Sequence, residues 1–143
     1  SADFVEFERF DITGTTGNDV IYTKGGDDRI IAGAGNDEIR AGAGADTIDG
    51  GAGDDIFLAV DSGDVLIGGS GLDRADVSVG LITEDIELDL LAGLGIGGVS
   101  WTGIERISGT LGSGNDSVTA GALYDYLSGN AGTDFLRLDY SGG

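Results

Sequence analysis

Large apolar residues recur at every ninth position in the first half of this chain. They are Ile21, Ile30, Ile39, Ile48, Phe57 and Leu66. Each is the middle of three residues whose side chains alternate in orientation, so that one points inward and its two neighbours point outward. This pattern predicts a series of very short β-strands with one buried side chain apiece.

Six residues rich in glycine and aspartate separate these strands and complete a nine-residue repeat. Written from Gly14, five units read GTTGNDVIY, TKGGDDRII, AGAGNDEIR, AGAGADTID and GGAGDDIFL. In these units glycine always occupies position four and aspartate always occupies position six. The weaker units AVDSGDVLI and GGSGLDRAD stay in phase, so seven copies cover residues 14–76. A second block, residues 111–137, reads LGSGNDSVT, AGALYDYLS and GNAGTDFLR.

The unit length indicates how the chain coils. Glycine in the turns permits positive φ, so six residues can reverse the chain between two short strands. Two units then complete a circuit of about eighteen residues, and stacked circuits form two parallel sheets. The position-eight side chains lie between the sheets, and loops line both edges. The predicted fold class is therefore all-β, a parallel β-solenoid.

The net negative charge of the chain limits the kinds of partner that it can bind. The chain has 26 acidic and 7 basic residues, a net charge of -19. This argues against nucleic acid as a partner, because phosphates require a basic surface. Such charge is also typical of disorder, but 40% of the residues are apolar and periodically placed, and proline is absent. No run of 18 apolar residues predicts a membrane span, and Ser1-Ala2-Asp3 does not begin a signal peptide.

The loop chemistry predicts a metal. Position-six aspartate follows the last glycine by two residues and brings a carboxylate to the point towards which the loop carbonyls turn. The chain has no cysteine or histidine, and a set of oxygen donors favours calcium over zinc or copper. One buried apolar side chain per unit returns less free energy than ordering nine residues costs, and stacked aspartates repel. We therefore expect a chain that is disordered without calcium and folded with it.

These units resemble the glycine-rich nonapeptide GGxGxDxUx of the RTX (repeats-in-toxin) family. The resemblance is strong over residues 14–76 and weaker over 111–137. It implies a parallel β-roll with each calcium ion between one loop and the loop two units later. The first loop would give the carbonyls of positions two and four and its aspartate, and the second would give the carbonyls of positions one and three and its own aspartate.

Carried onto this sequence, the resemblance implies five sites in the first block and room for one more in the second, so about five or six calcium ions. The first uses Thr15, Gly17 and Asp19 with Ala32, Ala34 and Asp37. The second uses Lys24, Gly26 and Asp28 with Ala41, Ala43 and Asp46. The third uses Gly33, Gly35 and Asp37 with Gly50, Ala52 and Asp55, and the fourth uses Gly42, Gly44 and Asp46 with Ala59, Asp61 and Asp64. The fifth uses Gly51, Gly53 and Asp55 with Gly68, Ser70 and Asp73, and the sixth uses Gly112, Gly114 and Asp116 with Gly129, Ala131 and Asp134.

Departures from the pattern are expected to weaken particular sites. Thr15 and Lys24 replace a glycine at position two, where only the carbonyl is needed. Ser62 replaces the position-four glycine of the fourth site, which is expected to be the weakest of the first block. Leu123 replaces it in the second block, whose coils are expected to stack poorly.

Residues 77–110 lack the nine-residue period. Alternating apolar residues predict strands over 77–81 and 86–90, and Ala92–Gly98 reads as a glycine-rich turn. We expect Trp101 in the core, and an exposed residue that stacks on a ligand is the alternative. Asp85, Glu87 and Asp89 are expected to face solvent.

The predicted organisation is one continuous solenoid. Residues 1–13 form a leading strand or cap, 14–76 the first RTX block, 77–110 a spacer of wider coils, and 111–143 a second, partial block. FERFDITGTTGND from Phe7 also resembles IERISGTLGSGND from Ile104, and the segment around Ile104 looks like the strand that precedes many RTX blocks. The longer repeat indicates either the start of a second supermodule or a chance likeness of two related segments.

The resemblance implies a calcium-binding module of a secreted bacterial protein, extracellular or on the cell surface. Such proteins typically leave by one-step (type I) export, and the module would fold on meeting extracellular calcium. The parent would be an adhesin, surface protein, toxin or exoenzyme, and the solenoid ends could associate with one another.

The alternative function is a carbohydrate-binding accessory module of a secreted polysaccharide-acting enzyme, or a module that recognises another cell-surface ligand. It requires an exposed aromatic platform, for which the candidates are Tyr22, Tyr124, Tyr126 and Tyr140. Catalysis is not expected, because histidine is absent and one member of each acidic pair, such as Asp54-Asp55, is already assigned to calcium.

Overall fold

The computed structural model describes residues 9–58, 60, 63–77, 83–89, 92–93, 98–120 and 126–138. These ranges contain fourteen β-strands, all paired in parallel, and no α-helix. The same ranges therefore hold no helix long and apolar enough to cross a membrane. The predicted fold class, an all-β parallel solenoid, is confirmed.

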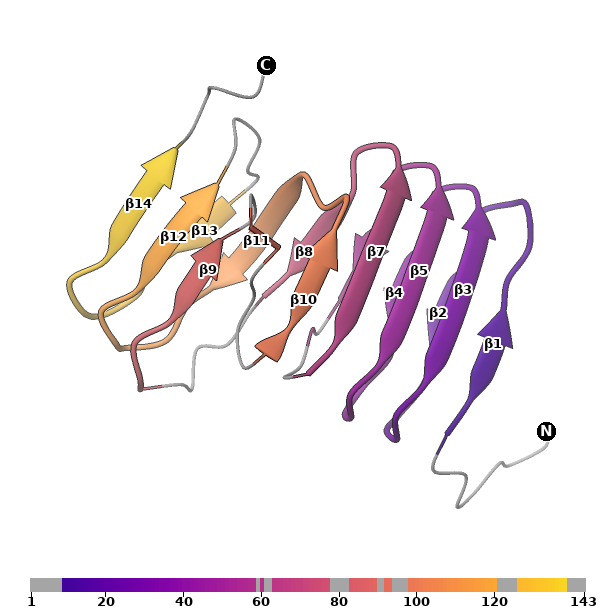
Figure 1. Ribbon diagram of the computed structural model, residues 1–143, viewed down its shortest axis with the longest axis horizontal. Helices are drawn as coiled ribbons and strands as arrows, with labels where there is room; N and C mark the ends of the chain where they lie inside the picture. Colours follow the sequence, from indigo (N-terminus) through magenta and orange to yellow (C-terminus); the bar gives the residue numbers. More distant parts are fainter. Residues whose placement is uncertain are drawn as a thin grey trace.

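The strands form two facing rows (Figure 1). One sheet is, in spatial order, β1 (Asp11–Thr13), β3 (Arg29–Ala34), β5 (Thr47–Ala52), β7 (Val65–Ser70) and β10 (Ser100–Thr102). The opposite sheet is β2 (Val20–Tyr22), β4 (Glu38–Arg40), β6 (Ile56–Phe57), β8 (Arg74–Asp76), β11 (Arg106–Thr110) and β13 (Tyr126–Ser128). The strands β9 (Glu87–Asp89), β12 (Ser117–Ala120) and β14 (Phe135–Leu138) form a third sheet that continues the first row.

The register follows the predicted circuit. Ile30 pairs with Ile48 in one sheet, and Ile39 pairs with Phe57 in the other, so each repeat lies beside the repeat two units later. The side chains of all four are buried between the sheets. Position eight therefore forms the core of the first block, as the nine-residue period predicted, whereas Leu136 at position eight of the last unit is 48% exposed.

Trp101 belongs to the same core. Its side chain is 3% exposed, and it pairs with Leu66 of the neighbouring strand β7. The interpretation of Trp101 as a core residue is confirmed. It is not available as an exposed residue that stacks on a ligand.

Strands of the first sheet are longer than the three residues predicted. β3, β5 and β7 run on through positions one to three of the following loop, where Gly33 pairs with Gly51 and Gly51 with Gly69. Those positions read AGA, GGA and GGS, so only small side chains lie between adjacent backbones. On the opposite edge the corresponding segment begins Thr23-Lys24, and among the residues described there the pairing is the isolated bridge between Gly25 and Ala43.

The spacer does not wind as a simple wider coil. β10 pairs with β7, whereas β9, which precedes it in sequence, pairs with β12. In Figure 1 the chain therefore reaches β9 first and then returns to β10, which lies nearer to β7. Of the two strands predicted here, β9 forms part of the second; Val77 is buried outside any strand, and residues 78–82 and 90 lie outside the described residues.

Other predictions for the spacer and second block have mixed outcomes. Asp85 and Glu87 are exposed as expected, and Asp89 is half-buried. The second block stacks in the regular register between β12 and β14, so the expected poor stacking is not seen in its described part. The longer repeat also keeps its register, because Asp11 pairs with Arg29 as Ser108 pairs with Tyr126.

Glycine is required where loops of successive coils touch. Gly51 has a φ of 103°, and a Cβ there would lie 2.1 Å from the carbonyl oxygen of Gly33. Gly98 has a similar φ of 88° but open space around the Cβ position. A side chain at either position would strain the backbone, but only at Gly51 would it also clash with the neighbouring coil. Comparing the two positions therefore distinguishes backbone strain from steric contact between coils.

We predict that Gly51→Ala destabilises the calcium-saturated fold by more than about 3 kcal/mol, because the methyl group adds a backbone clash to the conformational strain. Gly98→Ala carries the strain alone and should cost about 1–3 kcal/mol. Urea unfolding followed by circular dichroism measures both. Equal costs for the two variants would contradict the close stacking at Gly51.

Candidate metal centre

The position-six aspartates are buried along both edges of the solenoid. Their side chains are at most 2% exposed in Asp28, Asp37, Asp46, Asp55, Asp64, Asp73 and Asp116. Asp19 is half-buried and Asp134 is exposed. Removing so many carboxylates from water is unfavourable unless each is compensated by hydrogen bonds or by positive charge.

One oxygen of each carboxylate is hydrogen-bonded. The backbone N–H of Asp37 donates to Oδ1 of Asp55 at 2.8 Å, and the N–H of Asp55 donates to Oδ1 of Asp73 at 2.8 Å, in each case across eighteen residues. Asp28, Asp46 and Asp64 repeat the arrangement on the opposite edge. We call each such series a carboxylate row.

Before the first aspartate of two rows, the N–H donor belongs to an apolar residue. Phe10 donates its N–H to Asp28 Oδ1, and Ile86 donates to Asp116 Oδ1, so an apolar residue stands where the next loop has an aspartate. Each of these residues extends the backbone ladder without adding another charge.

In six of these aspartates the second oxygen has no donor. Oδ2 is buried without a hydrogen-bond partner in Asp28, Asp37, Asp46, Asp55, Asp73 and Asp116. The neighbouring loop brings further oxygens to it: a Cβ on Gly50 would lie 2.4 Å from Asp55 Oδ2 and 2.9 Å from the carbonyl oxygen of Gly68. At Gly14 the same two distances, to Asp19 Oδ2 and the Ala32 carbonyl oxygen, are 2.8 and 2.2 Å. Carboxylate and carbonyl oxygens therefore converge between stacked loops.

This donor set fits a hard divalent cation. Buried oxygens that lack a donor are satisfied by a metal ion, and calcium accepts six to eight oxygen ligands from carboxylates and carbonyls. Within the described ranges, no three acidic, histidine or cysteine side chains meet at one point. Coordination would therefore depend on backbone carbonyls as much as on the two aspartates of a pair.

The structure brings together the loops that hold most of the predicted ligands. Four loop contacts at positions two and four stack Gly33 on Thr15, Gly42 on Lys24, Gly53 on Gly35 and Gly132 on Gly114. In the sixth site the Asp116 N–H donates to Asp134 Oδ1 at 3.1 Å. In the fourth site Asp64 accepts from Asp46, but Ala59 and Asp61 lie outside the described residues.

Some of the predicted carbonyl ligands also accept hydrogen bonds. The position-three carbonyls of Ala43, Ala52 and Ser70 accept the N–H groups of Gly26, Gly35 and Gly53. A carbonyl oxygen has two lone pairs, so this bond leaves one lone pair for a cation.

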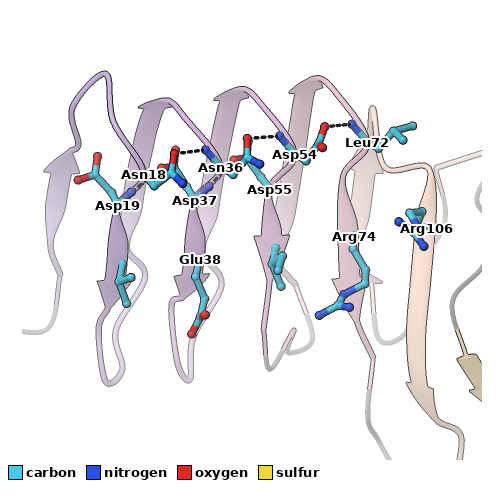
Figure 2. A pocket seen from close by; sticks show the side chains of 12 residues that line it. Asn18, Asp19, Asn36, Asp37, Glu38, Asp54, Asp55, Leu72, Arg74 and Arg106 are labelled. Carbon is cyan, nitrogen blue, oxygen red and sulfur yellow. Dashed lines mark hydrogen bonds between the residues drawn. The ribbon is translucent and has the colours of Figure 1, made fainter.

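A second ladder of side chains, at position five, was missed from the sequence. The N–H of Asn36 donates to Asn18 Oδ1, that of Asp54 donates to Asn36 Oδ1, and that of Leu72 donates to Asp54 Oδ1 (Figure 2). These bonds point to the preceding coil, whereas position-six bonds point to the following coil. The signal was present, because asparagine or aspartate fills position five in most of the better units.

The aromatic residues provide no common binding surface in the described ranges. Tyr22 is 59% exposed on β2 and Tyr126 is 66% exposed on β13, and these strands are at opposite ends of the six-stranded sheet. Tyr124 and Tyr140 lie outside the described residues. A shallow groove does follow one edge of the solenoid, but Asn18, Asn36, Asp54 and other polar residues line most of it (Figure 2).

Burial raises the pKa of the aspartates. Desolvation raises the pKa of Asp46 and Asp55 to about 6 from 3.8, and it outweighs the hydrogen bond that each accepts. Asp64, Asp28 and Asp27 raise the Asp46 pKa further by their negative charge. The pKa of Asp73 is also raised, by desolvation first and then by the charges of Glu105 and Asp54.

These pKa values predict how pH acts on the metal-free chain. Because the folded-state pKa exceeds the unfolded value, the folded chain holds more protons between pH 3.8 and about 6. The stabilisation is fully present below the unfolded pKa and is lost as pH rises through about 6. In chelator, the β-sheet signal in circular dichroism should therefore be greater at about pH 5 than at about pH 7.5. A signal that decreases towards pH 5 would show that the aspartates do not control folding.

Comparison with known families agrees with this geometry. The family model for the RTX calcium-binding nonapeptide repeat, in four copies, matches residues 11–39, 22–57 and 110–139, just over half of the chain. No curated protein matches the chain significantly. The matched ranges contain the buried Asp28, Asp37, Asp46, Asp55 and Asp116 and the loops that carry them. The chain therefore belongs to the RTX calcium-binding nonapeptide repeat family and is a structural calcium-binding module.

Proposed function

We propose that this chain is a folding switch: it stays unfolded where calcium is scarce and forms the solenoid when it meets extracellular calcium as part of a larger secreted protein. The observation that carries the proposal is the series of buried Oδ2 atoms without a donor. Without a cation these carboxylates lose hydration and repel one another, so the same rows that organise the holo fold oppose the apo fold.

The energetic balance favours calcium as the trigger. In the first block each nine-residue unit buries one position-eight side chain, and Ala75 fills that position in its last unit. In the second block Leu136, at position eight of the last unit, is exposed. So small a core per ordered residue needs an additional source of stability, as in other small domains. A ligand that binds only the folded state supplies it in proportion to its concentration.

Each of the six loop pairs assigned from the sequence is a candidate for one ion. The pair Asp55 with Asp73 has a donor-free Oδ2 and a position-one carbonyl close together, which supports it most directly. The pair Asp19 with Asp37 has the same convergence, but Asp19 Oδ2 also accepts hydrogen bonds from Thr15. The fourth pair depends on Asp46 and Asp64, and its loop departs from the repeat at Ser62. We expect this pair to bind most weakly.

The organisation supports a spacer or stabilising role. Strands β7 and β8 of the first block pair with β10 and β11 of the spacer, and β9 of the spacer pairs with β12 of the second block. We propose residues 14–76 and 111–143 as two repeat blocks joined by 77–110 in one solenoid, with 1–13 leading into it. RTX repeats are typical of secreted bacterial proteins, and we place the parent protein outside the cell or on its surface.

A calcium titration tests the switch. Far-UV circular dichroism in chelator should show a mostly disordered chain, and calcium should produce a cooperative transition to β-sheet at about 10⁻⁴–10⁻³ M. Magnesium should not replace calcium, because it requires a small octahedral site and retains its waters. A chain that is already fully β-sheet in chelator would overturn the proposal.

Asp55→Asn tests the carboxylate row without breaking its backbone ladder. Asparagine still offers Oδ1 to the Asp37 N–H, but it removes one charge from two neighbouring sites. We predict that the calcium midpoint rises about tenfold, equivalent to about 1.4 kcal/mol. Asp49→Asn, which removes a charge from position nine outside the rows, is the matched control and should leave the midpoint unchanged. Equal midpoints for both variants would argue against the row as the binding element.

A further inference from the structure

The carboxylate row on one edge continues past the last repeat. The N–H of Asp73 donates to Glu105 Oε2 at 2.9 Å, as the N–H of Asp55 donates to Asp73 Oδ1 at 2.8 Å. Glu105 lies in the non-repetitive segment, outside the residues that the family model matches. It therefore occupies the place of the next position-six aspartate without belonging to a repeat.

A backbone carbonyl comes with it. A Cβ on Gly68 would lie 2.5 Å from Asp73 Oδ2 and 1.9 Å from the carbonyl oxygen of Gly103. The same kinds of atoms converge at Gly50, where a Cβ would lie 2.4 Å from Asp55 Oδ2 and 2.9 Å from the Gly68 carbonyl oxygen, so the carbonyl lies closer at the junction. Gly103 thus supplies the carbonyl that position one of a further repeat would supply.

The carboxylate of Asp73 lacks a donor for one oxygen. Its side chain is 0% exposed, and Oδ2 has no hydrogen-bond partner. A buried, charged oxygen without a donor, placed beside a carbonyl, needs a cation. This is an observation separate from the nearness of two acidic residues.

The segment reaches this position by a shorter path than a repeat takes. Three residues, Gly103 to Glu105, replace a six-residue loop before strand β11, and the N–H groups of Glu105 and Arg106 both donate to the Asp73 carbonyl. The glutamate side chain is one methylene longer than aspartate. We attribute its presence here to that extra reach, because a shorter loop starts farther from the row.

We propose that Asp73 and Glu105, with the carbonyls of Gly103, Gly69 and Gly71, form a further calcium site at the junction of the first repeat block and the spacer. Gly69 and Gly71 are included by analogy with the coil before them. There the carbonyl oxygens of Gly51 and Gly53 point towards Gly69 and Gly71 of the next coil. This inference rests on the proposed calcium function and extends it to residues outside the repeat. It makes the spacer a part of the calcium-dependent fold.

The position of Trp101 provides a spectroscopic probe near the site. It is the one tryptophan of the chain, and Gly103 follows it by two residues, which span at most about 7 Å. Terbium ions prefer oxygen ligands as calcium does, and they emit when a nearby excited tryptophan transfers energy to them. Emission excited through tryptophan therefore includes that of a metal at this junction. Strand β10 also contacts Asp64 of the fourth pair, because the Ser100 N–H donates to its carbonyl at 2.9 Å, so the junction is identified by the emission that Glu105→Gln loses.

The experiment compares the full chain with Glu105→Gln, and Glu87→Gln serves as the control because Glu87 is exposed on β9 outside the rows. Bound calcium is counted by equilibrium dialysis at the lowest calcium concentration that saturates the unmodified chain. We expect Glu105→Gln to bind one ion fewer and to lose most of its tryptophan-sensitised terbium emission. Glu87→Gln should match the unmodified chain in both measurements.

The outcomes separate the two levels of inference. An unmodified chain that binds no calcium would refute the proposed function itself. Calcium binding with the same ion count and terbium emission in Glu105→Gln would refute the junction site alone. If Glu105→Gln does not reach the circular dichroism signal of the unmodified chain in calcium, Glu105→Asp is measured instead. It keeps the charge but shortens the reach, and an unchanged ion count and emission in that variant would equally refute the site.

Discussion

Buried aspartate carboxylates stacked one above another on the edges of the solenoid are the constraint on which the rest of this structure depends. One oxygen of these carboxylates is held by a backbone N–H of the preceding coil, and in six of them, among them Asp55 and Asp73, the second oxygen is buried without a donor. The fold brings like charges together in a dry environment, where they repel most strongly. A divalent cation would convert that repulsion into attraction between coils, which is the basis of the proposed coupling between calcium binding and stability.

The loops are built to permit this stacking and little else. Glycines such as Gly51 let the carbonyl of the previous coil approach to a distance that no side chain would allow. Position five bonds each loop to the coil before it, and position six bonds the same loop to the coil after it. Adjacent residues such as Asn36 and Asp37 thus hold a loop from both sides. The loops carry the contacts between coils because each strand is too short to do so alone.

The non-repetitive segment keeps the physical pattern after losing the sequence pattern. Ile86 donates the ladder N–H without adding a charge, Glu105 replaces an aspartate, and Trp101 takes its place in the core beside Leu66. A coil must offer its neighbour backbone donors, a fitting core residue and matched charge, and several residue types can do so. A repeat block can therefore be joined to a spacer without exposing the end of its sheet.

The sequence by itself determined whatever repeats at a fixed spacing. The nine-residue period specified the parallel circuit, the inward position of Ile30, Ile39 and Phe57, and an oxygen-only metal chemistry, because each follows from local turn geometry and from residue type. Only the tertiary structure decided which coils adjoin where the period lapses: that β10 lies between β7 and β9, and that Glu105 meets Asp73. The physical reason is that these contacts join residues whose separation no period fixes. Such contacts depend on how all the coils pack together, and no local sequence pattern predicts that packing.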